Sequence, residues 1–402
     1  MSERQEKLSV GRVFLAFLKL GLTSFGGPVA HLGYFRDEFV MRRRCLREDT
    51  YADLVALCQF LPGPASSQVG IGIGISQAGL RGGLAAWLGF TFPSALALIL
   101  FAYGVTSLDE TAVHAGWLHG LKVVAVAVVA QAIWGMARAL CPDRPRGTLA
   151  ILAAVLTLAW PGVFGQLVAI AAGAILGLLC LQPEGPANHE PHLFAPGRKT
   201  AIACLGLFCL LLLLLPLAAR SGQQALVLAD SFYRTGSLVF GGGHVVLPLL
   251  QAEVVNPGWI SKDLFLAGYG AAQAVPGPLF TFAAYLGAAS QITPNGWTGG
   301  LLCLLAIFLP SFLLVVGVLP FWEALRKNRQ VRLALLGVNA SVVGLLLAAF
   351  YDPVWSSGIL SAGDFILALT AFGLLTLWKT PPWLVVGATG LGAAALGYLG
   401  AF

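Results

Sequence analysis

Long apolar runs separated by short polar segments dominate the chain. About 20 apolar residues cross a hydrocarbon core about 30 Å thick, so these runs predict membrane-spanning helices. The predicted spans lie near residues 83–104, 120–139, 148–160, 162–181, 200–219, 298–319, 332–350, 359–378 and 383–400. Segments 148–160 and 162–181 are short and joined by Trp-Pro-Gly, which predicts a tight hairpin. The pattern indicates an all-α, polytopic integral membrane protein.

Glycine and proline interrupt this pattern at matching places in the two halves. "SFGGP" (24–28) corresponds to "VFGGG" (239–243), and "PGP" occurs at both 62–64 and 276–278. Backbone polar groups cannot be left bare in lipid, so such breaks are tolerated only inside protein or beside water. Proline is favourable in the first turn of a helix. We therefore expect half-helix N-termini near residues 28, 65, 243 and 279 to meet at the midplane, where their N–H groups suit an anion.

The chain carries an internal repeat. An ungapped alignment of 17–40 with 232–255 repeats several identities, pairs Lys19 with Arg234 and pairs Glu38 with Glu253. The match continues one residue out of step, through "QFLPGP" and "QAVPGP", then through "FPS" (92–94) and "LPS" (309–311). Matched breaks in the same order predict a duplicated gene, a layout typical of secondary transporters.

Basic residues gather near the N-terminus and in 42–49, 138–146 and 326–332, which places these segments in the cytoplasm. Five spans then separate equivalent points of the halves, so the two repeats are predicted to be inverted. The expected organisation is an N-terminal repeat (1–181), a polar linker (182–199), an extra inverting helix (200–221) and a C-terminal repeat (222–402). We expect an uncleaved, cytoplasmic N-terminus and a C-terminus on the periplasmic or extracellular side.

Composition excludes an ordinary soluble protein, because 57% of residues are hydrophobic, 10% are charged and the mean hydropathy is +0.82. The net charge of +6 needs no nucleic-acid partner, since cytoplasmic loops are basic anyway. The cysteines are scattered and show no metal-ligand spacing. Motifs of metalloproteases and serine hydrolases are missing from the sequence. We expect no enzyme, no cofactor and no metal site.

Candidate substrate-binding residues fall into two groups. The first group lies at the breaks and offers N–H groups, hydroxyls and an amide: Gly26, Gly27, Gly63, Ser66, Ser67, Gln68, Gly241, Gly242, Gly277 and Thr281. The alternative for its side chains is helix capping or close packing. The second group is cationic: Lys19, Arg36 and Arg234. Lys19 stands in an apolar run, where a charge is costly and usually functional, although it could snorkel to the surface. Arg36 could instead face lipid headgroups.

Candidate proton-coupling residues are two carboxylates and two histidines. Glu38 and Glu253 occupy matching positions, and buried carboxylates serve proton relays. The alternative for Glu38 is an ion pair with Arg42 one turn on. His31 and His244 follow the breaks, where a titrating group could respond to pH, but they are not repeat-equivalent.

The two "FGG" and two "PGP" motifs, together with "GGLAAWLGFTFPS" (82–94) and "GWISKDLFLAGYGAAQAVPGPLFTFAAYLG" (258–287), resemble the long, two-domain form of the chromate ion transporter family. Gly243 departs from the first half, which has Pro28. The resemblance implies an inner-membrane carrier, driven by the proton motive force, that expels chromate. Sulfate or another oxyanion as cargo, and an anion channel, stay open as alternatives. The expected partners are the oxyanion, protons, the lipid bilayer and a second copy in a homodimer.

Overall fold

The computed structural model describes residues 7–107, 116–182, 196–240 and 243–398, and within these residues every regular element is a helix. The first half comprises α1 (Val10–Thr23), α2 (Gly27–Arg36), the π-helical η1 (Asp37–Arg42), α3 (Glu48–Phe60), α4 (Ala65–Thr106), α6 (Gly116–Leu140), α7 (Arg144–Ala159) and α8 (Val163–Cys180). It is followed by α9 (Arg198–Ala219), the predicted extra helix.

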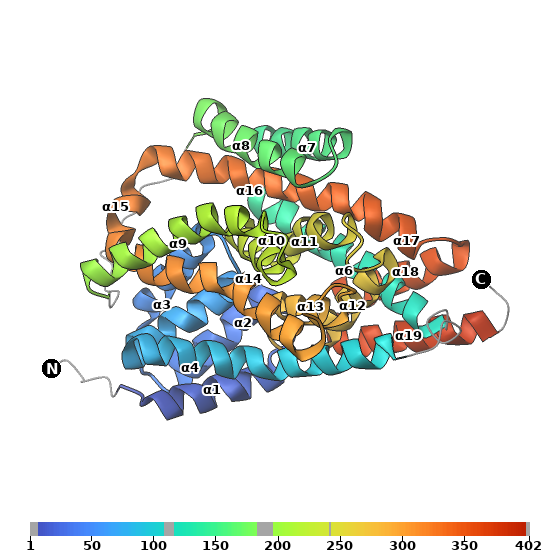
Figure 1. Cartoon of the computed structure of the whole chain (residues 1–402), viewed down its shortest axis with the longest axis horizontal. Coiled ribbons are helices and arrows are strands. Elements are labelled where there is room, and N and C mark those ends of the chain that lie inside the picture. The colour runs from blue at the N-terminus through green and yellow to red at the C-terminus, as the bar shows by residue number, and fades with distance from the viewer. Residues whose placement is uncertain (1–6, 108–115, 183–195, 241–242, 399–402) are drawn as a thin grey trace.

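The second half begins with α10 (Gln224–Leu238), η2 (Gly243–Val245), α11 (Val246–Leu250), the π-helical η3 (Gln251–Val255), α12 (Lys262–Ala274), η4 (Leu279–Thr281) and α13 (Phe282–Ala289). It ends with α14 (Gly296–Val318), η5 (Leu319–Phe321), α15 (Trp322–Lys327), α16 (Arg329–Ala349), η6 (Phe350–Trp355), α17 (Ser356–Gly358), α18 (Ala362–Thr376) and α19 (Pro382–Tyr398). The predicted spans agree with these helices to within a few residues. Helices α7 and α8 lie side by side, as the short connection predicts (Figure 1).

Helix α4 is a hairpin. Ala78 and Gly79 leave the helical conformation, with φ of −139° and +64°. The backbones of Gly74 and Gly82 touch across this reversal, so the two arms run antiparallel with almost no side chain between them. The arm that follows the first Pro-Gly-Pro break is therefore a short, folded-back segment, and the longer arm after Gly79 continues toward α19 (Figure 1).

The second half shows the same order of helices and a similar glycine–glycine contact at its chain reversal. Helix α12 ends before the second Pro-Gly-Pro break, η4 and α13 follow it, and residues 290–295 reverse the chain into α14. Gly287 and Gly299 touch backbone to backbone across this second reversal. Each half thus contains a helix, a break, a short folded-back helix and a long helix, in that order.

Six helices in the described part of the chain are long and apolar enough to cross a membrane: Ala65–Thr106, Gly116–Leu140, Val163–Cys180, Arg198–Ala219, Gly296–Leu325 and Arg329–Gly358. Shorter apolar helices lie between these helices and after the last of them. The chain is therefore a multi-pass membrane protein. In Figure 1, α1 begins at one end of the long axis and α19 finishes at the other.

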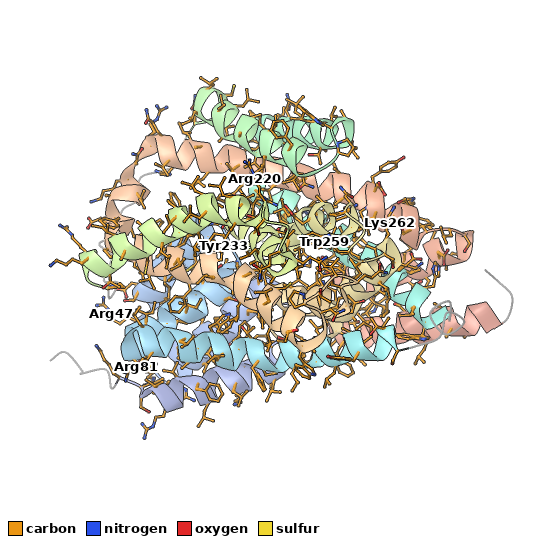
Figure 2. The ribbon with its side chains drawn as sticks, viewed as in Figure 1. Arg47, Arg81, Arg220, Tyr233, Trp259 and Lys262 are labelled. Atoms are coloured by element: carbon orange, nitrogen blue, oxygen red, sulfur yellow. The ribbon has the colours of Figure 1, made fainter. Side chains whose placement is uncertain are left out.

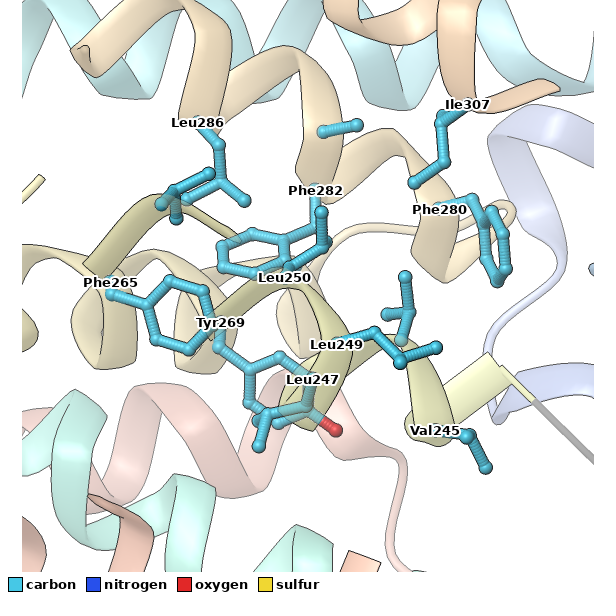
Figure 3. Close-up of a cluster of buried hydrophobic side chains, with 14 of the residues drawn as sticks. Val245, Leu247, Leu249, Leu250, Phe265, Tyr269, Phe280, Phe282, Leu286 and Ile307 are labelled. Atoms are coloured by element: carbon cyan, nitrogen blue, oxygen red, sulfur yellow. The ribbon is translucent and has the colours of Figure 1, made fainter. Parts of the chain in front are cut away.

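The largest buried cluster surrounds the short helices of the second half. Leu247, Tyr269 and Phe282 pack together there with Phe265, and Phe280 lies apart from them near Ile307 (Figure 3). All six side chains are almost completely buried. Protein therefore surrounds the interrupted backbone of η2, α11 and η4 and separates it from lipid, as the membrane environment requires.

Basic side chains lie toward both ends of the long axis, and Arg220 lies between them (Figure 2). Arg47 and Arg81 lie toward the end where α1 begins, and Lys262 lies toward the opposite end (Figure 2). Lys262 pairs with Asp352 at 2.6 Å. Asp263 lies in the first turn of α12 and Asp49 in that of α3, as expected for acids at helix N-termini.

Candidate functional site

The two Pro-Gly-Pro breaks are joined to the opposite half by reciprocal hydrogen bonds. Gly63 N–H donates to the carbonyl of Val239 at 2.6 Å, and Gly277 N–H donates to the carbonyl of Ser24 at 3.0 Å. Ser24 and Val239 are equivalent positions in the sequence alignment, just before the two Gly-Gly motifs. The Pro-Gly-Pro break of each half therefore bonds to the Gly-Gly break of the other half, and the interrupted helices form one interlocked centre.

The positive φ and the close packing at Gly63 and at Gly277 both require glycine at these positions. Gly63 has a φ of +122° and Gly277 one of +106°, values that side chains disfavour. A Cβ on Gly63 would lie 2.5 Å from Ser311 Oγ, and one on Gly277 would lie 2.8 Å from Ser94 Oγ. Ser94 and Ser311 are the serines of the matched "FPS" and "LPS" motifs, so the packing is reciprocal as well.

A small cavity of about 60 Å³ lies at this centre. Residues of both halves line it: Ser24, Gly26, Gly27, Pro28, His31, Val128, Gln131, His244, Ala272, Gln273, Val275, Gly277, Leu279, Leu375 and Pro382. We call it the central cavity. A Cβ on Gly243 would lie 3.5 Å from Pro28 and 3.7 Å from Leu279, so three of the expected half-helix starts are in contact there.

Polar atoms without protein partners surround the central cavity. In the described part of the chain, Ser24 Oγ, His31 Nε2 and Gln273 Nε2 are buried and accept or donate no hydrogen bond within the protein. Buried polar atoms are nearly always paired, so an unpaired group in a native structure requires an explanation. Three such atoms around one cavity indicate a polar ligand or water.

The two histidines reach the cavity from opposite halves. His31 Nδ1 lies 3.4 Å from Ser66 Oγ at the start of α4. His244 Nδ1 lies 2.7 Å from the hydroxyl of Tyr269 on α12. Each imidazole is therefore fixed by one neighbour, and His31 turns its second nitrogen to no protein partner in the described residues. The positions are not equivalent in the repeat, yet the fold brings both to one place.

The other hydroxyl and amide candidates lie at the breaks but mostly support them. Gln68 Nε2 donates to the carbonyl of Pro62 at 2.6 Å, and Thr281 Oγ1 donates to that of Pro278 at 2.8 Å. These bonds satisfy carbonyls that the breaks leave exposed. Ser66 contacts His31, while the buried hydroxyl of Ser67 has no partner in the described residues.

The cationic candidates do not line the central cavity. Lys19 is exposed on the outer face of α1, together with Leu15 and Leu22. Arg36 is half-exposed and pairs with Glu48 at 2.7 Å. Both positions fit the alternatives named above, a side chain that snorkels and one at the membrane surface.

Arg234 pairs with two carboxylates instead of facing the cavity. It lies 2.8 Å from Asp230 and 2.8 Å from Glu253. Glu38, the equivalent of Glu253, pairs with Arg42 at 2.9 Å and with Arg43 at 2.6 Å. The Arg42 pair is the local alternative that the sequence suggested. Both glutamates lie in π-helical segments, which are frequent at functional sites.

Sequence reasoning missed several residues of the central cavity. Ser24 and Gln273 stand inside the quoted motifs, so the motifs carried a signal for them. Gln131 comes from the middle of α6 and Pro382 from the start of α19, and no local pattern marks either. The predicted Gly241 and Gly242 lie outside the described residues.

Comparison with known proteins places the chain in a family. The family model described as "Chromate transporter" matches residues 11–178 and 226–398. A chromate transport protein of Pseudomonas aeruginosa is 29% identical over 350 residues, which cover 86% of this chain and 81% of that protein. A chromate transport protein of Cupriavidus metallidurans is 23% identical over 395 residues, covering 96% and 92%.

A shorter relative matches only part of the chain. The uncharacterized transporter YwrA of Bacillus subtilis is 30% identical over 179 residues, which cover 96% of its own length and 42% of this chain. No solved structure gives a significant match. The family match spans most of the chain and both of its halves. The chain therefore belongs to the chromate transporter family of multi-pass membrane proteins.

Proposed function

We propose that this protein carries chromate out of the cell across the inner membrane and that the anion binds in the central cavity. One observation carries the proposal: the cavity lies where the breaks of both halves meet, and buried polar atoms without protein partners surround it. The family match and the chromate transport relatives support chromate as the cargo.

The size and chemistry of the central cavity suit a tetrahedral oxyanion. A volume of about 60 Å³ exceeds the roughly 10–15 Å³ that a single water needs, so it leaves room for a small polar ligand. Ser24 Oγ, Gln273 Nε2 and the start of α2 at Gly27 supply neutral donors. Fixed donors and a helix N-terminus stabilise negative charge without a facing cation.

The titratable side chains that line the cavity are histidines. No lysine or arginine is among the described residues that line the central cavity, whereas His31 and His244 both line it. Protonation of either imidazole would add a positive charge beside the anion. In this proposal His31 and His244 contact the anion, and Lys19, Arg36 and Arg234 are not direct ligands.

The electrical part of the proton motive force can drive the export. One elementary charge moved across 100 mV is worth about 2.3 kcal/mol, so a dianion leaving a negative interior gains about 4.6 kcal/mol per 100 mV. An inside-negative potential therefore favours outward movement of chromate. Protons that accompany or oppose the anion change this value but are not required for the direction.

In this proposal the two halves are inverted repeats, which lets the cavity open to either side. The family model matches two regions that coincide with the predicted halves, and YwrA corresponds to little more than one of them. The reciprocal bonds of Gly63 and Gly277 relate the breaks of the two halves in the same way. Alternating access then follows from movement of one repeat against the other around the fixed site.

Flux into proteoliposomes tests the proposal. The purified protein should move chromate down an imposed potassium diffusion potential, and sulfate in excess should compete. A carrier also shows counterflow, the accumulation of labelled anion driven by unlabelled anion on the other side, which a channel does not show. Sulfate flux without chromate flux would reassign the cargo, and flux without counterflow would identify a channel.

Two measurements in cells test the direction and the topology. Expression should lower chromate accumulation, and a protonophore should abolish that effect. Fusion reporters at residues 1 and 402 should report opposite sides of the membrane, the first cytoplasmic. Reporters on the same side would contradict the inverted arrangement.

A further inference from the structure

Three charged side chains form a buried cluster in the second half, outside the central cavity. Arg234 Nη1 lies 2.8 Å from Asp230 Oδ2, and Arg234 Nη2 lies 2.8 Å from Glu253 Oε2. Arg234 Nε donates at 3.1 Å to Glu253 Oε1, so both oxygens of that carboxylate are bound. Only 10% of the Asp230 side chain and 8% of the Glu253 side chain are exposed. We call Asp230, Arg234 and Glu253 the charge triad.

The charges of the three side chains in the charge triad do not cancel. With all three groups ionised, one positive charge faces two negative ones, and the cluster carries a net charge of −1. An uncompensated charge in a buried site is strongly unfavourable, and one proton removes it. Glu253 uses both oxygens on Arg234, whereas Asp230 uses only Oδ2, so Oδ1 of Asp230 is the atom left to take the proton.

We propose that the charge triad is a proton-binding site, with the proton on Asp230, and that its occupancy is linked to the anion in the central cavity. The linkage rests on the proposed function, whereas the proton site does not. Nothing in the sequence pattern singled out Asp230, because its aligned position in the first half is Leu15.

Both elements that hold the charge triad end at the central site. Helix α10 carries Asp230 and Arg234, and the carbonyl of Val239, just after the helix, accepts the bond from Gly63. Five residues from Arg234 to Val239 correspond to about 7.5 Å along a helix. Glu253 lies in η3, which continues η2 and α11 from His244 on the cavity wall. The triad is therefore connected through its own backbone segments to the breaks and to the cavity wall.

The elements packed against the triad bring few other titratable groups. Helix α14 contains no charged residue. Helix α9 contributes Cys204 and Cys209 and begins with Arg198 and Lys199, and Tyr233 on α10 donates its hydroxyl to the carbonyl of Phe208. On α12, Lys262 and Asp263 pair with Asp352 and Lys122 respectively.

The sign of the linkage follows from electrostatics. Without its proton the triad is negative and repels a dianion in the central cavity, and with the proton it is neutral. Protonation therefore raises the affinity for the anion, and the anion raises the affinity for the proton to the same extent. One proton then travels with each dianion, so a net single negative charge crosses the membrane. The membrane potential still favours export.

Infrared spectroscopy tests the proton site without any ligand. The purified protein should show the C=O band of a protonated carboxylic acid that disappears as the pH is raised. Asp230→Asn should lack this band, while the control Asp263→Asn, a change at an exposed carboxylate, should keep it. The amide oxygen introduced by Asp230→Asn still accepts a bond from Arg234, so the variant should fold. An absent band in the wild type, or a band that survives Asp230→Asn, would overturn the proton site.

Proton uptake tests the linkage. Sulfate or chromate added to the weakly buffered protein at alkaline pH should draw in one proton more for the wild type than for Asp230→Asn. The anion affinity of Asp230→Asn should also exceed that of the wild type at this pH, because the variant mimics the protonated triad. Equal uptake would overturn the linkage and leave anion transport intact. A wild type that binds neither anion would overturn the proposed function and the linkage together, whereas the infrared result would still decide the proton site.

Discussion

The two halves of the protein have corresponding helix breaks, but their charged side chains make different contacts. At the breaks the halves are reciprocal, since Gly63 bonds to Val239 and Gly277 bonds to the equivalent Ser24. At the matched charges they diverge. Arg234 is held between Asp230 and Glu253, whereas the equivalent Lys19 is exposed and Glu38 pairs with Arg42 and Arg43.

The difference separates geometry that both halves need from chemistry that one half supplies. A break requires glycine at positive φ and a small neighbour, and the structure meets both requirements in each half. A charge cluster depends on which side chains a helix turns toward its neighbours. Arg234 faces inward on α10 and Lys19 faces outward on α1, although the two residues occupy aligned positions in the sequence.

The largest effect is expected at the two central glycines. Gly63→Ala and Gly277→Ala should each lower chromate flux at least about a hundredfold, because a shift of about 1 Å in a site has that cost. The added Cβ meets Ser311 or Ser94 and strains a positive φ. The control is Gly162→Ala, which has a φ of +108° but open space around it. Normal flux in one of the two variants would confine the site to a single half.

A second comparison sets the charge triad of the second half against the ion pairs of Glu38 in the first half. Arg234→Ala should lower the free energy of unfolding by about 3–5 kcal/mol, because two buried carboxylates lose their partner. Arg42→Ala should cost about 0–1 kcal/mol, since Arg42 is 57% exposed and Arg43 remains bound to Glu38. Chemical denaturation in detergent micelles measures both. A similar loss of unfolding free energy in both variants would show that the ion pairs of the two halves contribute equally to stability.

The hydroxyl of Ser24 offers a smaller test at the cavity. Ser24→Ala should weaken anion binding by about tenfold, the loss of about 1.4 kcal/mol expected for one hydrogen bond. The second half has Val239 at this position and cannot replace it. Ser76→Ala is a matched control, because Ser76 bonds only within α4 and outside the cavity. Equilibrium dialysis with labelled sulfate gives the affinities, and equal values would remove Ser24 from the site.

The smallest effect is expected at Lys19. Lys19→Ala should leave chromate flux within about twofold of the wild type, because exposed charges far from a site contribute little. Initial rates in proteoliposomes provide the measurement. A large loss of flux in Lys19→Ala would show that Lys19 joins Glu38 in another conformation of the carrier, and would restore the equivalence that the alignment suggests.

Much of the architecture could be predicted from the sequence because it follows from local rules. Spans need long apolar runs, and the helices α6, α9, α14 and α16 begin and end close to the predicted residues. The breaks need glycine and proline in short motifs, and "PGP" marked both of them. The contacts between Gly243, Pro28 and Leu279 also match the expectation that helix starts would meet.

Tertiary structure alone decided which polar groups face the central cavity. The sequence supplied the breaks, the paired motifs and the family resemblance, since these depend on neighbours along the chain. It could not select Gln131 from α6 or Pro382 from α19, or join Asp230 to Glu253, because those meetings depend on how helices rotate and pack. It also matched Lys19 with Arg234, and only packing shows that one faces outward while the other is held by two carboxylates. Chain pattern fixes where a membrane helix must break, and the contacts between helices determine what that break binds.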